Sequence, residues 1–159
     1  MNKKKIIIYS TLLLLIDQIS KLIVANNINL NSDIEIIKSF FSLTYVRNTG
    51  AAWGMFSNNQ ILISIISIIF FAYLIIYIYN NKVKYMEMIS FSLIIGGLIG
   101  NLLDRLIRNY VIDFLSFNIF GYDFPVFNLA DIFIVSGVFI LIANTFINDR
   151  ERKKSWVKD

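Results

Sequence analysis

The sequence predicts an all-α polytopic membrane protein, with four transmembrane helices and a small extracytoplasmic β element. Composition leads to this fold class, because 57% of the 159 residues are hydrophobic and only 16% are charged, against about 25% charged residues in a soluble domain. Several apolar runs also approach the roughly 20 residues that a helix needs to cross a bilayer. A soluble globular enzyme is therefore excluded, and we expect residues 1–159 to form a single integral membrane domain.

The apolar runs predict four spans, at about residues 6–24, 61–79, 87–105 and 129–147. The second span is the clearest, because it contains no charged residue, whereas Asp17 and Lys21 interrupt the first. The basic start and the apolar run after it also resemble a cleavable signal peptide, but no small-residue cleavage site follows. We therefore expect an uncleaved first span.

The positive charges predict the orientation of these spans. Ten of the fifteen Lys and Arg residues fall at the two ends of the chain or in the short loop after the second span. Cytoplasmic segments carry an excess of such residues, so both termini and this loop are expected in the cytoplasm, and the connections 25–60 and 106–127 outside. The net charge of +4 then reflects topology and attraction to anionic membrane lipid. No basic groove with interleaved aromatic residues indicates a nucleic-acid partner.

The first outer connection is predicted to form the β element, at about residues 34–57. Apolar residues partly alternate over 34–45, which favours a strand. The letters VRNTG at 46–50 then supply turn chemistry. We expect this element to lie on the outer surface of the membrane.

The amino-acid counts limit the chemistry of any site. The chain has no His and no Cys, which excludes an imidazole base, a thiolate nucleophile and the commonest metal sites. Catalysis would run on carboxylates, Lys, Tyr, Ser or Thr, and we expect no metal and no other cofactor. An ionisable group in a span costs about 3 kcal/mol and is a functional candidate by default. Once acids in ordinary loops are set aside, four candidates remain outside the cytoplasm: Asp17, Asp104, Asp113 and Asp131.

Asp17 and Lys21 are four residues apart in the first span, so they share a helix face and can pair. The simpler interpretation is a neutralised ion pair near the outer interface. The alternative is that the pair also shapes a functional site.

Two segments repeat one pattern, an Asn and an Asp three residues apart: Asn101 with Asp104, and Asn128 with Asp131. This spacing puts both side chains on one face of a helix. Because the third span runs outward and the fourth inward, both pairs are expected at one depth near the outer leaflet. Each pair also has a structural interpretation, since Asn128 suits a helix cap and Asp104 with Arg105 suits the membrane interface.

Asp113 lies between these segments and is flanked by large apolar residues. Such surroundings have a low dielectric, which raises the pKa of a carboxylic acid. If Asp113 faces Asp131, the two carboxyls cannot both ionise easily and would share a proton, which makes one an acid and the other a base. This is among the few hydrolytic arrangements open to a chain without His or Cys.

The same acids also fit a second class of protein, a small proton-coupled transporter. A carrier places its acids near the midplane, with access from both sides. Here the four Asp residues map to the outer third, and the span at 61–79 offers no polar path. We therefore favour the hydrolase and keep the transporter as the alternative.

Five motifs, specific when taken together, follow one another along most of the chain: DQISK at 17–21, RNTGAAWG at 47–54, GNLLDR at 100–105, VIDF at 111–114 and FNLAD at 127–131. In this order and in a four-span layout, the chain resembles the lipoprotein signal peptidases (signal peptidase II), a family of bacterial intramembrane aspartic proteases. One departure is Ile132, which follows Asp131 where the family often has a small hydroxyl residue. We expect altered packing behind the acids there, with activity retained.

The resemblance implies an activity and a set of residues. Family members release the signal peptide of a prolipoprotein just before a cysteine that already carries diacylglyceryl. Asp113 and Asp131 would be the catalytic dyad, acting on a water without a covalent intermediate. The residues implied to bind substrate or support the site are Asp17, Lys21, Asn48, Gly50, Asn101, Asp104, Arg105, Asn128 and Ala130.

The resemblance also implies a location and partners. The protein would lie in the bacterial cytoplasmic membrane, with its active site near the outer leaflet and in contact with membrane lipid. It would be sensitive to the cyclic peptide globomycin, and we expect a monomer.

Overall fold

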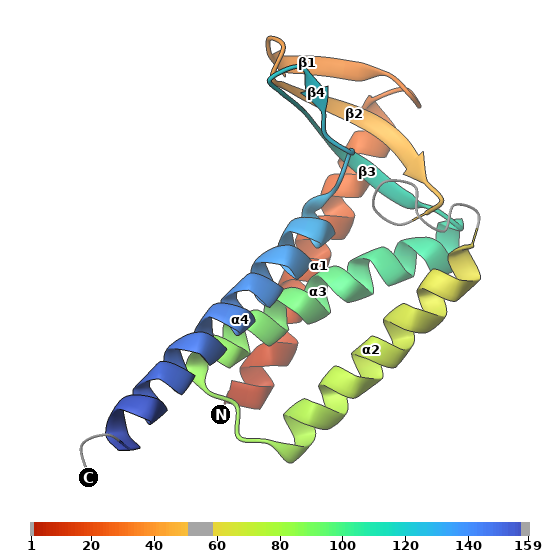
Figure 1. Ribbon diagram of the computed structural model, residues 1–159. Coiled ribbons are helices and arrows are strands. Elements are labelled where there is room, and N and C mark those ends of the chain that lie inside the picture. Colours follow the sequence, from red (N-terminus) through yellow and green to blue (C-terminus); the bar gives the residue numbers. More distant parts are fainter. Residues whose placement is uncertain (1, 51–58, 157–159) are drawn as a thin grey trace.

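The computed structural model of the protein describes residues 2–50 and 59–156. Residues 51–57, which end the expected β element and hold part of the second motif, lie outside the described residues. Figure 1 shows the helices and strands in the order α1 (Asn2–Asn27), β1 (Asp33–Ile37), β2 (Phe41–Asn48), α2 (Gln60–Asn80), α3 (Tyr85–Arg108), β3 (Val111–Ile119), β4 (Tyr122–Asp123) and α4 (Leu129–Trp156).

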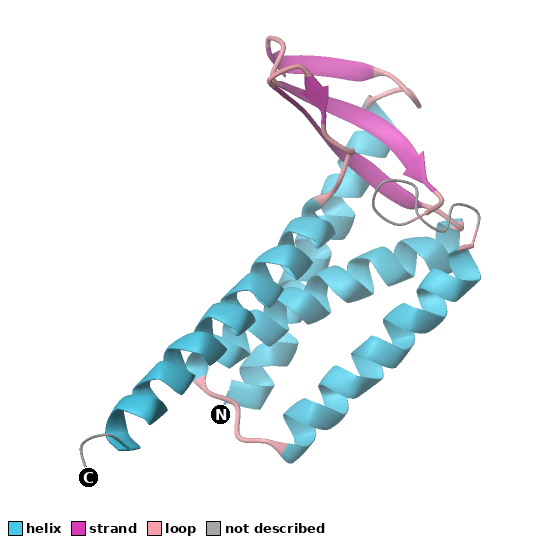
Figure 2. Cartoon of the chain, in the orientation of Figure 1, coloured by secondary structure: helices cyan, strands magenta, loops and turns pink. Residues whose placement is uncertain are grey.

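Each of the four helices is long and apolar enough to cross a membrane. The strands gather at one end of these helices, and the start of α1 lies with the end of α4 at the other (Figures 1 and 2). Four such helices with a small antiparallel sheet confirm the predicted fold class.

Helix α3 is the most buried of the four and packs against α1, α2 and α4. Its glycines allow the close approach that small residues give to membrane helices. A Cβ added at Gly96 would lie 2.8 Å from the Leu13 Cβ on α1, and one added at Gly97 would overlap the Ala130 carbonyl oxygen on α4. Side chains at these positions would therefore push the helices apart.

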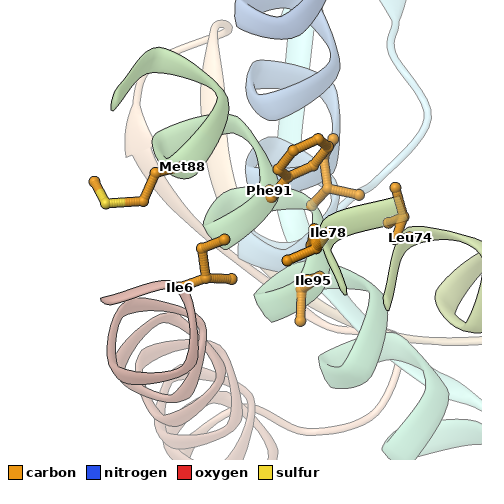
Figure 3. Close-up of a cluster of buried hydrophobic side chains, with 7 residues drawn as sticks. Ile6, Leu74, Ile78, Met88, Phe91 and Ile95 are labelled. Atoms are coloured by element: carbon orange, nitrogen blue, oxygen red, sulfur yellow. The ribbon is translucent and has the colours of Figure 1, made fainter. Parts of the chain in front are cut away.

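An apolar cluster fills the space between α1, α2 and α3, away from the sheet. Figure 3 shows side chains from the three helices converging there; the buried members are Ile6, Leu74, Ile78, Met88, Phe91, Ile94 and Ile95. Inside a bilayer, dispersion contacts of this kind hold helices together, because lipid tails are as apolar as the side chains.

The sheet is antiparallel, with strands in the order β1-β2-β3-β4. The sequence predicted strands only in the first outer connection, and β3 and β4 of the second were not predicted. The reason is burial: residues 111–114 of β3 are all buried, so the alternation of apolar and polar residues that marks a half-buried strand is missing. A second apolar cluster attaches the sheet to the end of α1; its buried members are Val24, Ile28, Tyr45, Ile112 and Phe114.

Candidate active site

The geometry of strand β3 explains how Asp113 can lie between large apolar residues in the sequence and still face a cavity. Asn109 ends α3 in the left-handed conformation, at φ 61°, which Asn tolerates better than most residues, and the chain turns directly into β3. Successive side chains of a strand point to opposite faces. Ile112 and Phe114 pack into the cluster at the end of α1, while Val111 and Asp113 line a cavity on the other face.

Asp113 is held by two amide side chains from different elements. The Asn48 Nδ2 atom donates to Asp113 Oδ2 at 2.7 Å, and the Asn128 Nδ2 atom donates to Asp113 Oδ1 at 2.5 Å. Asn48 lies opposite Val111 in the β2–β3 ladder, so Asp113 is its diagonal neighbour on the same face. The Asn48 Oδ1 atom accepts the Gly50 backbone N–H at 2.8 Å, which fixes the orientation of this amide.

Asp131 lies in the first turn of α4, and Asn128 is the cap of that helix. The Asp131 backbone N–H donates to Asn128 Oδ1 at 3.1 Å, and the Asn128 backbone N–H donates to Asp131 Oδ2 at 3.1 Å. This is the reciprocal bonding of a capping box. The helix-cap interpretation of Asn128 is therefore correct in geometry, and the amide nitrogen of the same side chain binds Asp113.

Lys21 connects α1 to this region through three bonds. Its Nζ atom lies 2.9 Å from Asp17 Oδ2, 2.9 Å from Asp104 Oδ2 and 2.9 Å from Asn101 Oδ1. Asn101 then donates from Nδ2 to Asp131 Oδ1 at 2.8 Å. A continuous chain of hydrogen bonds therefore runs from Lys21 through Asn101 to Asp131.

Asp17, Lys21 and Asp104 are all fully buried. Arg108, four residues after Asp104, forms a second ion pair with it. For Asp104, this burial contradicts the interpretation that Asp104 and Arg105 extend to the membrane interface: Asp104 faces the bundle interior, where buried charges require partners.

Asp17 reaches both α3 and α4. Its Oδ1 atom accepts the Ala130 backbone N–H at 3.0 Å, which satisfies one of the free donors at a helix start. A Cβ added at Gly100 would lie 2.5 Å from Asp17 Oδ2, so glycine leaves the room that this carboxylate occupies. The Asp17–Lys21 pair therefore also positions the start of α4.

Arg105 borders the same region from α3. Its guanidinium donates from Nη1 to the Asn101 carbonyl oxygen and from Nη2 to the Gly50 carbonyl oxygen, both at 3.3 Å. Its buried Nε atom has no hydrogen-bond partner within the described part of the chain. Arg105 also lines the cavity, so its guanidinium group puts a positive charge at the cavity wall.

The cavity has a volume of about 470 Å³, within the range of small-molecule and peptide-side-chain sites. Polar side chains form one end of it: Asn48, Asn101, Arg105, Asp113 and Asp131. Apolar residues 124–127 and the first turns of α4 complete the wall. Ile132, expected to pack behind the acids, instead lines the cavity and is 38% exposed.

The electrostatics of the cavity favour a neutral Asp113. Its burial, followed by repulsion from Asp131, raises the pKa of Asp113 to about 7, against the opposing hydrogen bonds from the two Asn amides. Asp131 is thus close enough to influence the ionisation of Asp113. A group whose pKa lies near the working pH suits general acid–base chemistry.

Among the described residues, no group of three or more His, Cys, Asp or Glu side chains could hold a metal ion. Sequence reasoning missed two members of the buried network. Gln18 donates from Nε2 to Asp17 and to Asp104, at 3.1 and 3.3 Å, and Arg108 pairs with Asp104. The i,i+4 spacing of Asp104 and Arg108 was the available signal.

The fold and the site together define a polytopic membrane protein with a largely apolar cavity, lined by residues of β2, β3, α3 and α4, that carries polar side chains at one end. Comparison with known proteins gives the family. The family described as signal peptidase (SPase) II matches residues 9–147, and the chain belongs to it. It is therefore a signal peptidase, a protease of bacterial membranes that spans the bilayer several times, and membership favours the protease over the transporter.

Two curated relatives carry the name lipoprotein signal peptidase. The protein of Staphylococcus haemolyticus (strain JCSC1435) is 41% identical over 139 residues, which cover 86% of this chain and 88% of the relative. The protein of Staphylococcus aureus (strain bovine RF122 / ET3-1) is 37% identical over 150 residues, with 93% and 91% covered.

Two solved structures, each described as a bacterial membrane enzyme obtained by the in meso method, have the same fold. The one at 2.3 Å resolution is 34% identical, with a TM-score of 0.85, and covers 94% of this chain and 92% of its own. The one at 1.9 Å resolution is 35% identical, with a TM-score of 0.79 and coverage of 89% and 92%.

Proposed function

We propose that this chain removes the signal peptide from lipid-modified prolipoproteins, cleaving before the lipidated cysteine with a water that Asp113 and Asp131 activate. The observation that carries the proposal is that both acids line one cavity and that Asn128 donates a hydrogen bond to each of their carboxyl groups. The names of the curated relatives support the substrate class.

The first half of the reaction adds water to the scissile amide. One Asp is ionised and takes a proton from the water, whose oxygen forms a bond to the carbonyl carbon. The other Asp is protonated and gives its proton to the carbonyl oxygen, so the intermediate is a neutral diol.

The second half breaks the carbon–nitrogen bond. The Asp that took the water proton passes it to the leaving nitrogen, which departs as the amine of the lipidated cysteine. A hydroxyl proton of the diol returns to the other Asp as the carbonyl reforms. The products are the carboxyl end of the signal peptide and the new amino terminus, and the dyad regains its starting state.

The polar neighbours have supporting roles in this proposal. Asn48, Asn101 and Asn128 hold the carboxyl groups in place, and Arg105, which lines the cavity, binds a polar group of the substrate. Both termini would lie in the cytoplasm and the dyad near the outer leaflet. Sensitivity to globomycin, contact with membrane lipid and a monomeric state stay predictions of the family resemblance.

The test is prolipoprotein processing by the purified protein in lipid, with wild type, Asp113→Asn and Asp131→Asn. We expect complete loss of cleavage in both variants, because neither half of the dyad has a substitute. Asp33→Asn, an exposed acid on β1, is the matched control and should cleave like the wild type. Cleavage by either dyad variant, with the unfolding temperature unchanged, would contradict the assignment.

A further inference from the structure

The two acids of the proposed dyad differ in their surroundings, although each accepts two hydrogen bonds. Asp113 lies on a strand and is 2% exposed, and within the described residues it accepts hydrogen bonds only from the neutral amides of Asn48 and Asn128. Asp131 lies in the first turn of α4 and is less buried. The start of a helix favours a negative charge, so the backbone alone already distinguishes the two.

The second difference between the two acids is that Asp131 accepts a hydrogen bond from an amide group, that of Asn101, which is itself bound to a cation. Asn101 has its oxygen 2.9 Å from the Lys21 Nζ atom and its nitrogen 2.8 Å from Asp131 Oδ1. A flipped amide would place NH₂ against an ammonium group and oxygen against a carboxylate, so only one orientation is favourable. In that orientation the cation polarises the N–H bonds that point at Asp131, and hydrogen bonds in such chains strengthen one another.

Among the described residues, charged groups lie near each acid of the dyad on three elements, which are α1, α3 and the element that carries the other acid. Lys21 and Asp17 come from α1, and Asp104 and Arg105 come from α3; each acid of the dyad faces the other. The field of Lys21 acts on Asp113 as well, and Arg105 interacts with both acids. Among the described residues, however, the path of hydrogen bonds from Lys21 through Asn101 reaches Asp131 first, and it continues to Asp113 only beyond Asp131, through Asn128.

We propose that Lys21 is a positioning residue of the dyad: by holding the Asn101 amide, it keeps Asp131 ionised as the base and leaves the proton on Asp113 as the acid. The inference rests on the two-Asp mechanism proposed above and adds the order of protonation. Lys21 does not touch the reacting atoms. Its buried pairs with Asp17 and Asp104 hold it in place for this task.

Removing Lys21 alone would break the ion pair of the buried Asp17 carboxylate and leave its charge uncompensated, which is strongly destabilising. The double variant Asp17→Asn/Lys21→Met removes one charge of each sign and leaves Asp104 with Arg108. Asp17→Asn alone is the matched control, since Lys21 keeps Asp104 and Asn101. A third variant, Asn101→Leu, breaks the connection and leaves all the charges present.

The readout is the pH profile of kcat/KM for prolipoprotein cleavage. Its acid limb reports the ionisation that the dyad needs. We expect the limb to move up by about one pH unit in the double variant and in Asn101→Leu, the size expected for a lost bond to a charged group. In Asp17→Asn the acid limb should stay at the same pH or move to a lower pH, because this variant lacks a neighbouring negative charge.

An acid limb of the double variant that coincides with that of Asp17→Asn would overturn the role of Lys21. If the double variant does not fold, Asn101→Leu decides the question alone. An acid limb of Asn101→Leu at the same pH as that of the wild type would then contradict the role of Lys21. A wild type that cleaves no prolipoprotein would instead contradict the proposed function.

Infrared spectroscopy tests the order of protonation without turnover. At pH 6 we expect a protonated carboxyl C=O band that disappears in Asp113→Asn and persists in Asp131→Asn. Loss of the band only in Asp131→Asn would overturn the assignment of acid and base.

Discussion

At the scale of single residues, Asp113 shows why burial and hydrogen bonding must be weighed together. The two Asn amides stabilise its charge, yet burial and the charge of Asp131 outweigh them and raise the pKa of Asp113 to about 7. The unfolded chain would hold the same proton with a pKa near 3.8. Folding therefore strengthens proton binding at this position.

This difference predicts how stability depends on pH. Because the folded state binds the proton more tightly, Asp113 favours folding below about pH 4, and its contribution is lost as the pH rises toward 7. The full range corresponds to about 4 kcal/mol. Thermal unfolding of wild type and Asp113→Asn in detergent measures it: relative to wild type, the variant should gain stability steadily from pH 4 to pH 8.

The test depends on how the stability difference between Asp113→Asn and wild type changes with pH, and a constant difference between them does not affect it. An Asn side chain at position 113 cannot accept on both sides, so it loses a bond to Asn48 or Asn128, but this loss is the same at every pH. Asp33→Asn supplies the background trend. A difference between wild type and Asp113→Asn that is constant with pH would show that Asp113 is ionised throughout.

At the scale of elements, three separate contacts fix the position of the first turn of α4. Asn128 caps it, Asp17 accepts the Ala130 N–H, and Gly97 of α3 lies against the Ala130 carbonyl. Asp131 depends on all of them for its position. A small shift of this turn would move the base relative to Asp113.

The glycines of the α3–α4 contact allow a controlled test of this idea. In Gly97→Ala the new methyl group overlaps the Ala130 carbonyl oxygen, while in Gly137→Ala it lies 2.8 Å from the Ser90 carbonyl oxygen, two turns away along α4. Both changes overpack the same interface, at a cost of about 1–3 kcal/mol. We expect similar drops in unfolding temperature.

Only Gly97→Ala should also reduce kcat, by roughly 100-fold, because catalysis tolerates little misplacement of a reacting group. Gly137→Ala should keep the turnover of the wild type. Equal losses of kcat in the two variants would show that activity follows overall stability and that the first turn of α4 has no special part.

At the scale of the whole molecule, the sequence predicts the four helices and singles out the acids that lie in them. Apolar length predicts the helices, and scarce charges stand out against them: Asp17, Asp104 and Asp131 are visible because a membrane makes them expensive. Helical spacing also predicts the Asp17–Lys21 pair, which the structure shows at 2.9 Å.

What the sequence does not predict are contacts between elements. Nothing in the spacing shows that Lys21 also reaches Asp104 and Asn101 on α3, because those distances depend on how two helices pack. Strand β3 was missed because its buried stretch has no alternation. The diagonal contact of Asn48 with Asp113 follows only once that strand is known.

Cysteine labelling can test the orientation of the whole molecule in the membrane, because the composition leaves no other thiol to react. The chain has no Cys, so single cysteines report only their own position. Lys38 lies between β1 and β2 and Lys82 between α2 and α3, and both are exposed. Because ten of the fifteen basic residues belong to the two ends of the chain or the loop after α2, the positive-inside rule puts Lys38 outside and Lys82 in the cytoplasm.

In intact cells, a membrane-impermeant maleimide should label Lys38→Cys, and it should label Lys82→Cys only after the membrane is opened. The two variants lose the same charge, so each controls for the other, and nine basic residues still hold the orientation after Lys82 is replaced. The reverse pattern would put the dyad on the cytoplasmic side. There it would meet prolipoproteins before they cross the membrane, and the proposed cleavage of a lipidated precursor at the outer leaflet would be untenable.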